Sequence, residues 1–212
     1  MNSSTWDERY NKDEYHYGTG PNDFLKEWVG KLLPRDRESQ PARVLCLADG
    51  EGRNSVYLAE LGAEVTALDI SPVGLQKARN LADSRGVSIQ TQVADLTQCE
   101  LPETHYDGIV MIFCHLPSHN RPRLYQQIRQ SLKADGWLLV EGYSEAQLGR
   151  NTGGPASVDL LLSAQELKAA FTDFRIEHSA ERLRDIQEGG GHTGVGAVCQ
   201  FVGYKQSDEE ST

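Results

Sequence analysis

The sequence has little of what several classes of protein require. Its 21 lysine and arginine residues are outnumbered by 31 aspartate and glutamate residues, for a formal net charge of −10. Affinity for nucleic acid comes largely from basic side chains that neutralise phosphates, so this balance argues against a nucleic-acid partner and an anionic membrane surface. No apolar run approaches the ~20 residues of a membrane-spanning helix, and the first residues lack the apolar core of a secretory signal. We therefore expect a cytoplasmic protein without nucleic-acid or membrane partners, either a monomer or a weak homodimer.

Metal-ligand and disulfide patterns are also scarce. The cysteines, none in a C-x-x-C pair, are Cys46, Cys99, Cys114 and Cys199. Two of them, Cys46 and Cys114, lie in apolar runs, which is typical of small buried hydrophobic residues. His115 and His119 are four residues apart, but Pro117 between them argues against a metal-binding pair on a helix. We expect no metal site, and a domain of ~150–200 residues buries enough surface to fold without one.

Apolar runs that alternate with helical patterns predict one domain over residues 21–205. The predicted strands cover residues 43–48, 64–70, 88–96, 106–113, 137–143, 175–184 and 195–205. The predicted helices cover residues 21–33, 54–62, 71–86, 122–136 and 163–171. Five strands with intervening helices specify a doubly wound parallel sheet, while the last two strands, joined by a short link, should be antiparallel to each other. The expected α/β fold is a Rossmann-like seven-stranded sheet, mostly parallel with an antiparallel last strand, and helices on both faces.

The two ends of the chain differ from this domain. Residues 1–20 are polar and aromatic, and we expect them to form a flexible arm or lid. Residues 206–212 are acidic and polar, which predicts a disordered tail.

The first predicted strand runs into the sequence VLCLADGEGRN, residues 44–54. Ligands of doubly wound sheets bind beyond the carboxyl ends of the strands, and glycines such as Gly50 and Gly52 let the backbone approach them closely. No G-x-x-x-x-G-K-[ST] phosphate loop is present, and the dinucleotide pattern G-x-G-x-x-G would need glycine at Ser55. The turn therefore predicts a ligand site but gives little support for pyrophosphate binding.

Acidic residues end the next two predicted strands. Asp69 lies 19 residues beyond Gly50, where a carboxylate can accept hydrogen bonds from both hydroxyls of a ribose. Asp95 ends the third strand, where it can accept from an adenine amino group. Either acid alone could be a solvated loop residue. Together with the turn they indicate an adenosine cofactor: Asp69 fits NAD and other adenosine cofactors alike, and Asp95 favours the latter.

Over about residues 40–143 the chain resembles the class I S-adenosylmethionine-dependent methyltransferases. That family has an acidic, glycine-rich first turn, acids after strands two and three, and an antiparallel last strand. The motifs W-D-E-R-Y, Y-x-Y-G-x-x-P-N and G-E-G-R-N-S-V-Y-L-A are similar to its small bacterial branch of tellurite-resistance and thiopurine-methyltransferase-like enzymes. The chain departs from the family at Cys46, in place of an acid, and at Ala48, in place of a glycine. Asp49 or Glu51 could replace the lost contact to the cofactor's amino group.

The resemblance implies S-adenosyl-L-methionine as cofactor and S-adenosyl-L-homocysteine as product. It implies cofactor binding by Tyr17, Ala48, Asp49, Gly50, Gly52, Asn54, Asp69, Ile70, Asp95, Leu96 and Phe113. Methyl transfer from a sulfonium depends mainly on proximity and an in-line approach, and a base matters only if the nucleophile carries a proton. The candidate catalytic residues at the same edge are His115, Tyr143, Arg150 and His192. His192 would be carried over the site by the flexible link EGGGHTG.

The predicted activity is methyl transfer from S-adenosylmethionine to a small molecule. The narrower resemblance suggests a chalcogen oxyanion such as tellurite or selenite, or a small thiol. An oxyanion would need local positive charge, which Arg121, Arg150 and His192 could supply. Two alternatives remain at this stage: a regulatory module that binds S-adenosylmethionine without catalysis, and an NAD-dependent oxidoreductase.

Overall fold

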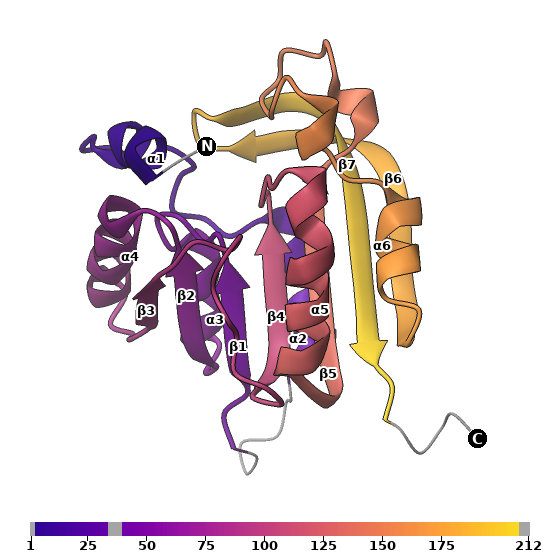
Figure 1. The fold of residues 1–212 in the computed structure, drawn as a ribbon. Helices are drawn as coiled ribbons and strands as arrows, with labels where there is room; N and C mark the ends of the chain where they lie inside the picture. Colours follow the sequence, from indigo (N-terminus) through magenta and orange to yellow (C-terminus); the bar gives the residue numbers. More distant parts are fainter. Residues whose placement is uncertain (1–2, 34–39, 208–212) are drawn as a thin grey trace.

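The computed structural model describes residues 3–33 and 40–207 of the chain. Its centre is a seven-stranded sheet in the order β3-β2-β1-β4-β5-β7-β6 (Figure 1). The strands are β1 (Arg43–Leu47), β2 (Glu64–Asp69), β3 (Gln90–Val93), β4 (Tyr106–Ile112), β5 (Leu132–Tyr143), β6 (Phe174–Glu188) and β7 (His192–Lys205). The helices are α1 (Ser3–Tyr10), α2 (Asp23–Leu32), α3 (Arg53–Glu60), α4 (Pro72–Ser84), α5 (Arg121–Ser131) and α6 (Ala164–Ala170). Short 3₁₀ turns are η1 (Ser118–Asn120), η2 (Glu145–Gln147) and η3 (Val158–Leu160).

The directions of the strands confirm the predicted fold. Strands β3, β2, β1, β4 and β5 are paired in parallel, while β7 is antiparallel to both β5 and β6. Strand β1 lies between β2 and β4, so the order of strands reverses at β1. The connections on either side of such a switch point diverge and leave a crevice beyond the carboxyl ends of the strands.

Both faces of the sheet are buried, as the nearly continuous apolar runs predict. Successive residues of β1 alternate between the faces: Leu45 and Leu47 pack in one cluster with helix α5, and Val44 and Cys46 pack in the other with helix α2. The helices are fixed at their starts by the residues that the sequence indicates. Ser71 caps α4 by accepting a 3.0 Å hydrogen bond from the backbone N–H of Gly74, with proline in the first turn.

Two predicted boundaries were wrong near the middle of the chain. Helix α5 ends at Ser131 rather than at residue 136, because Leu132 is fully buried and pairs with Tyr106 as the start of β5. The chain then turns through Asp135, which has a φ of 59°. Strand β3 (Gln90–Val93) is shorter than the predicted strand over residues 88–96, because it is a mostly exposed strand at the edge of the sheet.

The glycine-rich link between the last two strands is not an open loop. Pairing continues to Glu188 opposite His192, so that only residues 189–191 form the turn. Gly189 (φ 67°) and Gly194 (φ 103°) adopt the left-handed backbone that this hairpin needs. Glycine therefore closes the hairpin rather than loosening it.

The N-terminal residues lie over the carboxyl edge of the sheet (Figure 1). Helix α1 packs on α4, and the backbone N–H of Gly191 in the hairpin turn donates to the carbonyl of His16 at 3.2 Å. Whether this arm opens stays a prediction. Most of the expected tail, residues 208–212, lies outside the described residues. Across the described ranges, no helix combines the length and apolarity needed to cross a membrane.

Candidate cofactor and acceptor site

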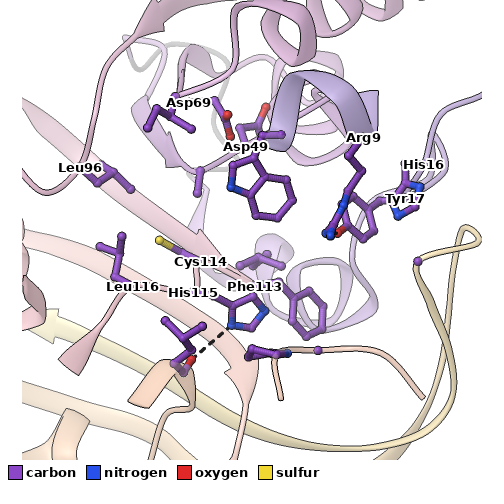
Figure 2. Close-up of a pocket in the computed structure, with 18 of the residues that line it drawn as sticks. Arg9, His16, Tyr17, Asp49, Asp69, Leu96, Phe113, Cys114, His115 and Leu116 are labelled. Atoms are coloured by element: carbon purple, nitrogen blue, oxygen red, sulfur yellow. Dashed lines mark hydrogen bonds between the residues drawn. The ribbon is translucent and has the colours of Figure 1, made fainter. Parts of the chain in front are cut away.

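A cavity of about 850 Å³ lies beyond the carboxyl ends of β1, β2 and β4, beneath α1 and the hairpin turn. Figure 2 shows Asp69 and Leu96 at one end and Arg9, His16 and Tyr17 at the other. Of the predicted site residues, the cavity lining includes Tyr17, Ala48, Asp49, Asn54, Asp69, Ile70, Asp95, Leu96, Phe113 and His115. The topology thus brings together side chains from five separate segments of the chain.

Gly50 and Gly52, predicted to approach the cofactor, do not line this cavity. Both have positive φ, 61° and 90°. A Cβ on Gly52 would lie 2.5 Å from the Cβ of Ala78, and one on Gly50 would lie 2.7 Å from the Tyr10 hydroxyl. The structure therefore explains these glycines by close packing of the turn against α4 and α1.

Ala48 lines the cavity in a strained conformation. Its φ of 52° lies in the left-handed region, which costs an L-residue with a Cβ about 1–2 kcal/mol. Phe113, after the neighbouring strand β4, also has a positive φ of 50°. Strain of this kind often persists at functional sites, where the surrounding structure holds it.

Ala48→Gly should raise the free energy of unfolding by about 1 kcal/mol, because glycine adopts the left-handed backbone without a steric penalty. Urea denaturation of the variant and the wild type measures the change. Ala59→Gly is the matched control, since Ala59 lies in helix α3 and its replacement should lose about 1 kcal/mol. Equal destabilisation at both positions would contradict the assignment of strain to Ala48.

Asp69 ends β2 and is 5% exposed. Its carboxylate accepts 2.8 Å hydrogen bonds from the backbone N–H groups of Gly50 and Ser71. Burial raises the pKa of Asp69, while these N–H groups oppose the shift. The carboxylate is thus held in place at the cavity wall before any ligand arrives.

Cys46 stands where the family has an acid, and Asp49 and Glu51 are the two acids that could replace its contact to the cofactor. These two side chains have different surroundings. Asp49 lines the cavity and accepts a 2.5 Å hydrogen bond from the Ser55 hydroxyl. Burial raises the pKa of Asp49 to about 6, and the nearby Asp69 charge adds to the shift. Glu51 instead accepts from the His16 backbone N–H at 2.8 Å and pairs with Lys77 at 2.6 Å. Glu51 therefore holds the arm, and Asp49 is the acid available to a ligand.

Asp95 lies beyond β3 at the end of the cavity that Ile70 and Leu96 also line. Its Oδ1 accepts 2.8 Å hydrogen bonds from both the backbone N–H and the hydroxyl of Thr97. Within the described part of the chain, its Oδ2 accepts none. An acceptor oxygen beside two aliphatic side chains suits the edge and faces of a purine.

His115 follows β4, and its Nδ1 lies 3.4 Å from the carbonyl oxygen of Leu160 (Figure 2). Burial lowers the pKa of His115 to about 4, so the ring is neutral at neutral pH. The carbonyl can only accept, which assigns the proton to Nδ1 and leaves the lone pair on Nε2. Nε2 has no hydrogen-bond partner among the residues that the structure describes. The Nε2 of a neutral imidazole in this state can accept a hydrogen bond from a ligand.

The pH dependence of the free energy of unfolding should report the protonation state of His115. The fold favours the neutral ring, so the stability that it contributes is present above the unfolded pKa of ~6.5 and is lost as pH falls toward about 4. Urea denaturation of the wild type and His115→Gln at several pH values measures the difference. We expect this difference to be constant above neutral pH and to decline over that window. A difference independent of pH would show that the ring is not held neutral.

Two of the other three catalytic candidates, Tyr143 and Arg150, do not line the cavity. Tyr143 is fully buried, with its ring stacked 5.9 Å from His115 and its hydroxyl donating to the carbonyl of Thr152 at 3.4 Å. Arg150 is exposed and donates to the carbonyl of Ala146 at 2.8 Å. The side chain of His192 is outside the described set, although its neighbour Gly191 lines the cavity. Tyr143 therefore supports the His115 ring instead of facing a ligand.

The sequence interpretation missed several lining residues from the arm and from the segment after β5. They are Trp6, Arg9, Tyr10, His16 and Gly153–Ser157. The arm is anchored by Lys77, whose Nζ donates to the carbonyls of Tyr10, Lys12 and Glu14 at 3.3, 2.9 and 2.7 Å. Its aromatic residues were the only sequence signal for this role. In the described ranges, no cluster of three acidic, histidine or cysteine side chains could hold a metal ion.

Comparison with known proteins decides among the families that this geometry allows. A family profile for the methyltransferase domain matches residues 44–136, from β1 into the start of β5. Over these residues the chain is similar to the class I S-adenosylmethionine-dependent methyltransferases, whose fold it shares. The matched segment contains the strained turn at Ala48, all three cavity acids and His115.

Curated proteins that are similar to this chain in sequence include methyltransferases. The chain is 24% identical over 161 residues to the probable S-adenosyl-L-methionine-dependent methyltransferase TehB of Haemophilus influenzae, a match that covers 75% of the chain and 55% of TehB. It is 30% identical over 126 residues to the uncharacterised methyltransferase YbaJ of Bacillus subtilis, covering 59% of the chain and 46% of YbaJ. The chain therefore spans about half the length of these curated relatives.

Solved structures share the fold at low identity. The crystal structure of TehB from Haemophilus influenzae superposes with a TM-score of 0.71 at 19% identity, over 96% of this chain and 67% of that one. A protein studied for the conversion of a disulfide bond into a thioacetal group during echinomycin biosynthesis superposes with a TM-score of 0.75 at 18% identity. That match covers 99% of this chain and 92% of the other.

Proposed function

We propose that the protein transfers the methyl group of S-adenosylmethionine to a small nucleophile. The observation that carries this proposal is the cavity, in which Asp49, Asp69 and Asp95 follow β1, β2 and β3 and the neutral His115 follows β4. The match of residues 44–136 to the methyltransferase-domain family supports the same activity.

The residues of the cavity suit the parts of S-adenosylmethionine in order. Asp69 would accept from the ribose hydroxyls, while Asp95, Ile70 and Leu96 would hold the adenine. Ala48 and Asp49 would face the methionine portion, where the Asp49 carboxylate suits its ammonium group. Asn54 also lines this region, and its Oδ1 is fixed by a 3.0 Å hydrogen bond from the backbone N–H of Asn22.

When bound, the cofactor supplies a methyl carbon whose bond to sulfur breaks as the nucleophile attacks, the electron pair staying on sulfur as a neutral thioether. The protein's part is to align the nucleophile and exclude water. Phe113 and Tyr143 pack beside the ring of His115, at centroid distances of 6.3 and 5.9 Å. His115 Nε2 would accept a hydrogen bond from a nucleophile that carries a proton and so orient it.

Selenite, tellurite and small thiols are the acceptors that we propose. The sequence similarity to TehB and the tellurite-resistance motifs support the oxyanions, and the acceptor end of the cavity is lined by apolar residues beside His115. The positive charge that an oxyanion needs does not come from the arginines first considered. Arg121 is buried against Glu166 at 2.8 Å, and Arg150 lies outside the cavity.

An acceptor panel tests the proposed activity. The wild type is incubated with S-adenosylmethionine and selenite, tellurite or one of several thiols, and release of S-adenosylhomocysteine is measured by chromatography. We expect at least one acceptor to raise the rate well above the background, and His115→Gln to lower the rate with a thiol. If no acceptor raises the rate of S-adenosylhomocysteine release above the background rate, the result would favour a regulatory module that binds the cofactor without catalysis.

A further inference from the structure

The two ends of the cavity differ in charge. All three carboxylates of the lining, Asp49, Asp69 and Asp95, lie at the end assigned to the cofactor. Among the described residues, the lining from Phe113 onward, including Leu116, Pro117 and residues 153–157, contains no acidic residue. A second ligand at that end meets apolar groups, one neutral histidine and the side chains of the arm.

Two arginines of the described chain line the cavity, and within that part of the chain a carboxylate pairs with Arg53 but not with Arg9. Arg53 Nη1 lies 2.6 Å from Glu188 Oε2, and both side chains are buried. Arg9 forms no ion pair with a carboxylate of the described residues; its Nη1 donates to the Tyr17 hydroxyl at 2.9 Å. Its guanidinium also lies over the Trp6 ring, 4.7 Å from the centroid. Stacking leaves the remaining in-plane N–H groups of a guanidinium able to donate.

The charge of Arg9 acts on the acceptor end. It contributes to the low pKa of His115, although burial is the main cause. At the cofactor end, by contrast, the arginine that lowers the pKa of Asp49 is Arg53 and not Arg9. Figure 2 shows Arg9 reaching from α1 toward Tyr17, at the end of the cavity away from Asp69 and Leu96. The arginine is thus placed to meet the acceptor and not the nucleoside.

We propose that Arg9 binds an anionic group of the methyl acceptor and thereby selects acceptors with a carboxylate or an oxyanion, an inference that rests on the proposed function. A guanidinium recognises such groups through two parallel N–H···O bonds. An anion held by Arg9 would lie at the acceptor end of the cavity, near His115 and the sulfonium of the cofactor. Its nucleophilic atom would then be directed at the methyl carbon. A cationic acceptor would be repelled by both Arg9 and the sulfonium.

Calorimetric titration of the protein saturated with S-adenosylhomocysteine tests this role. The probes are selenite, 3-mercaptopropionate and its neutral isostere 3-mercaptopropionamide. We expect the wild type to bind both anions more tightly than the amide. Arg9→Gln should weaken binding of the anions by about tenfold or more and leave the amide unchanged. Arg9→Lys should recover part of the loss, because it keeps the charge without the planar fork.

Arg150→Gln is the matched control, because it removes an arginine outside the cavity, and it should bind all probes as the wild type does. Equal binding of the anions by the wild type and Arg9→Gln would overturn the proposal. So would a loss of affinity for S-adenosylhomocysteine in Arg9→Gln with none for 5′-methylthioadenosine, since that pattern assigns Arg9 to the cofactor's own carboxylate. If the wild type does not bind S-adenosylhomocysteine, the proposed function fails, and titrating the unliganded protein with selenite still tests Arg9.

Discussion

Asp69→Asn should weaken binding of S-adenosylhomocysteine by about 10- to 100-fold, the effect of losing a charge-assisted hydrogen-bond acceptor worth ~1.5–3 kcal/mol. The wild-type carboxylate is buried and already oriented by the N–H groups of Gly50 and Ser71, so it meets the ribose without rearrangement. Asparagine keeps the size of the side chain but removes the charge and one acceptor oxygen. Isothermal titration calorimetry measures the change.

The same substitution removes the acceptor of one of two buried backbone N–H groups, so its structural effect must be separated from its effect on binding. Ser71→Ala disturbs the start of helix α4 without removing the carboxylate, because Ser71 caps that helix. It should lower stability by ~1 kcal/mol and change the affinity much less than Asp69→Asn does. Similar losses of affinity in both variants would mean that Asp69 acts only by shaping the turn.

Glu141→Ala should lower the free energy of unfolding by about 3–5 kcal/mol, which is typical of breaking a buried ion pair by removing one partner. Glu141 is fully buried in β5. Its carboxylate accepts from Asn22 Nδ2 at 2.8 Å, Arg184 Nη2 at 2.6 Å and Gln200 Nε2 at 2.5 Å. All three donors would lose this acceptor in the low-dielectric interior. Urea denaturation provides the measurement.

Replacing both charges tests whether the unpaired charge causes that loss. The double variant Glu141→Leu with Arg184→Met should be more stable than Glu141→Ala, because it removes both charges of the pair, and Glu188, which also contacts Arg184, keeps its ion pair with Arg53. Glu145→Ala is the control for removing a nearby exposed acid, and we expect it to change stability by less than ~0.5 kcal/mol. A double variant less stable than the single one would contradict this explanation.

Local signals predicted most of the fold. Ser71 and Pro72 mark the start of α4, and the apolar runs mark β1, β2 and β4, because each pattern depends on neighbouring residues alone. The acids Asp69 and Asp95 could be placed at one edge because the carboxyl ends of parallel strands meet there. Family resemblance added His115.

The remaining features depend on contacts between distant parts of the chain. The buried network around Glu141 joins residues as far apart as Asn22 and Gln200, and no local pattern announces such partners. Pairing of the last two strands decided that EGGGHTG is a hairpin turn, although its composition alone is typical of an open loop. Arg9 reaches the cavity only because Lys77 and Glu51 hold the arm across the sheet edge.

The central claim is that the cavity binds an adenosine cofactor with an amino-acid tail. Calorimetric titration of the wild type with S-adenosylhomocysteine, with NAD titrated in parallel, tests it most directly. The structure predicts saturable binding of S-adenosylhomocysteine at one site per chain, tighter than binding of 5′-methylthioadenosine, because Asp49 would contact the amino-acid portion. No binding of S-adenosylhomocysteine at millimolar concentration, or binding of NAD alone, would contradict the account.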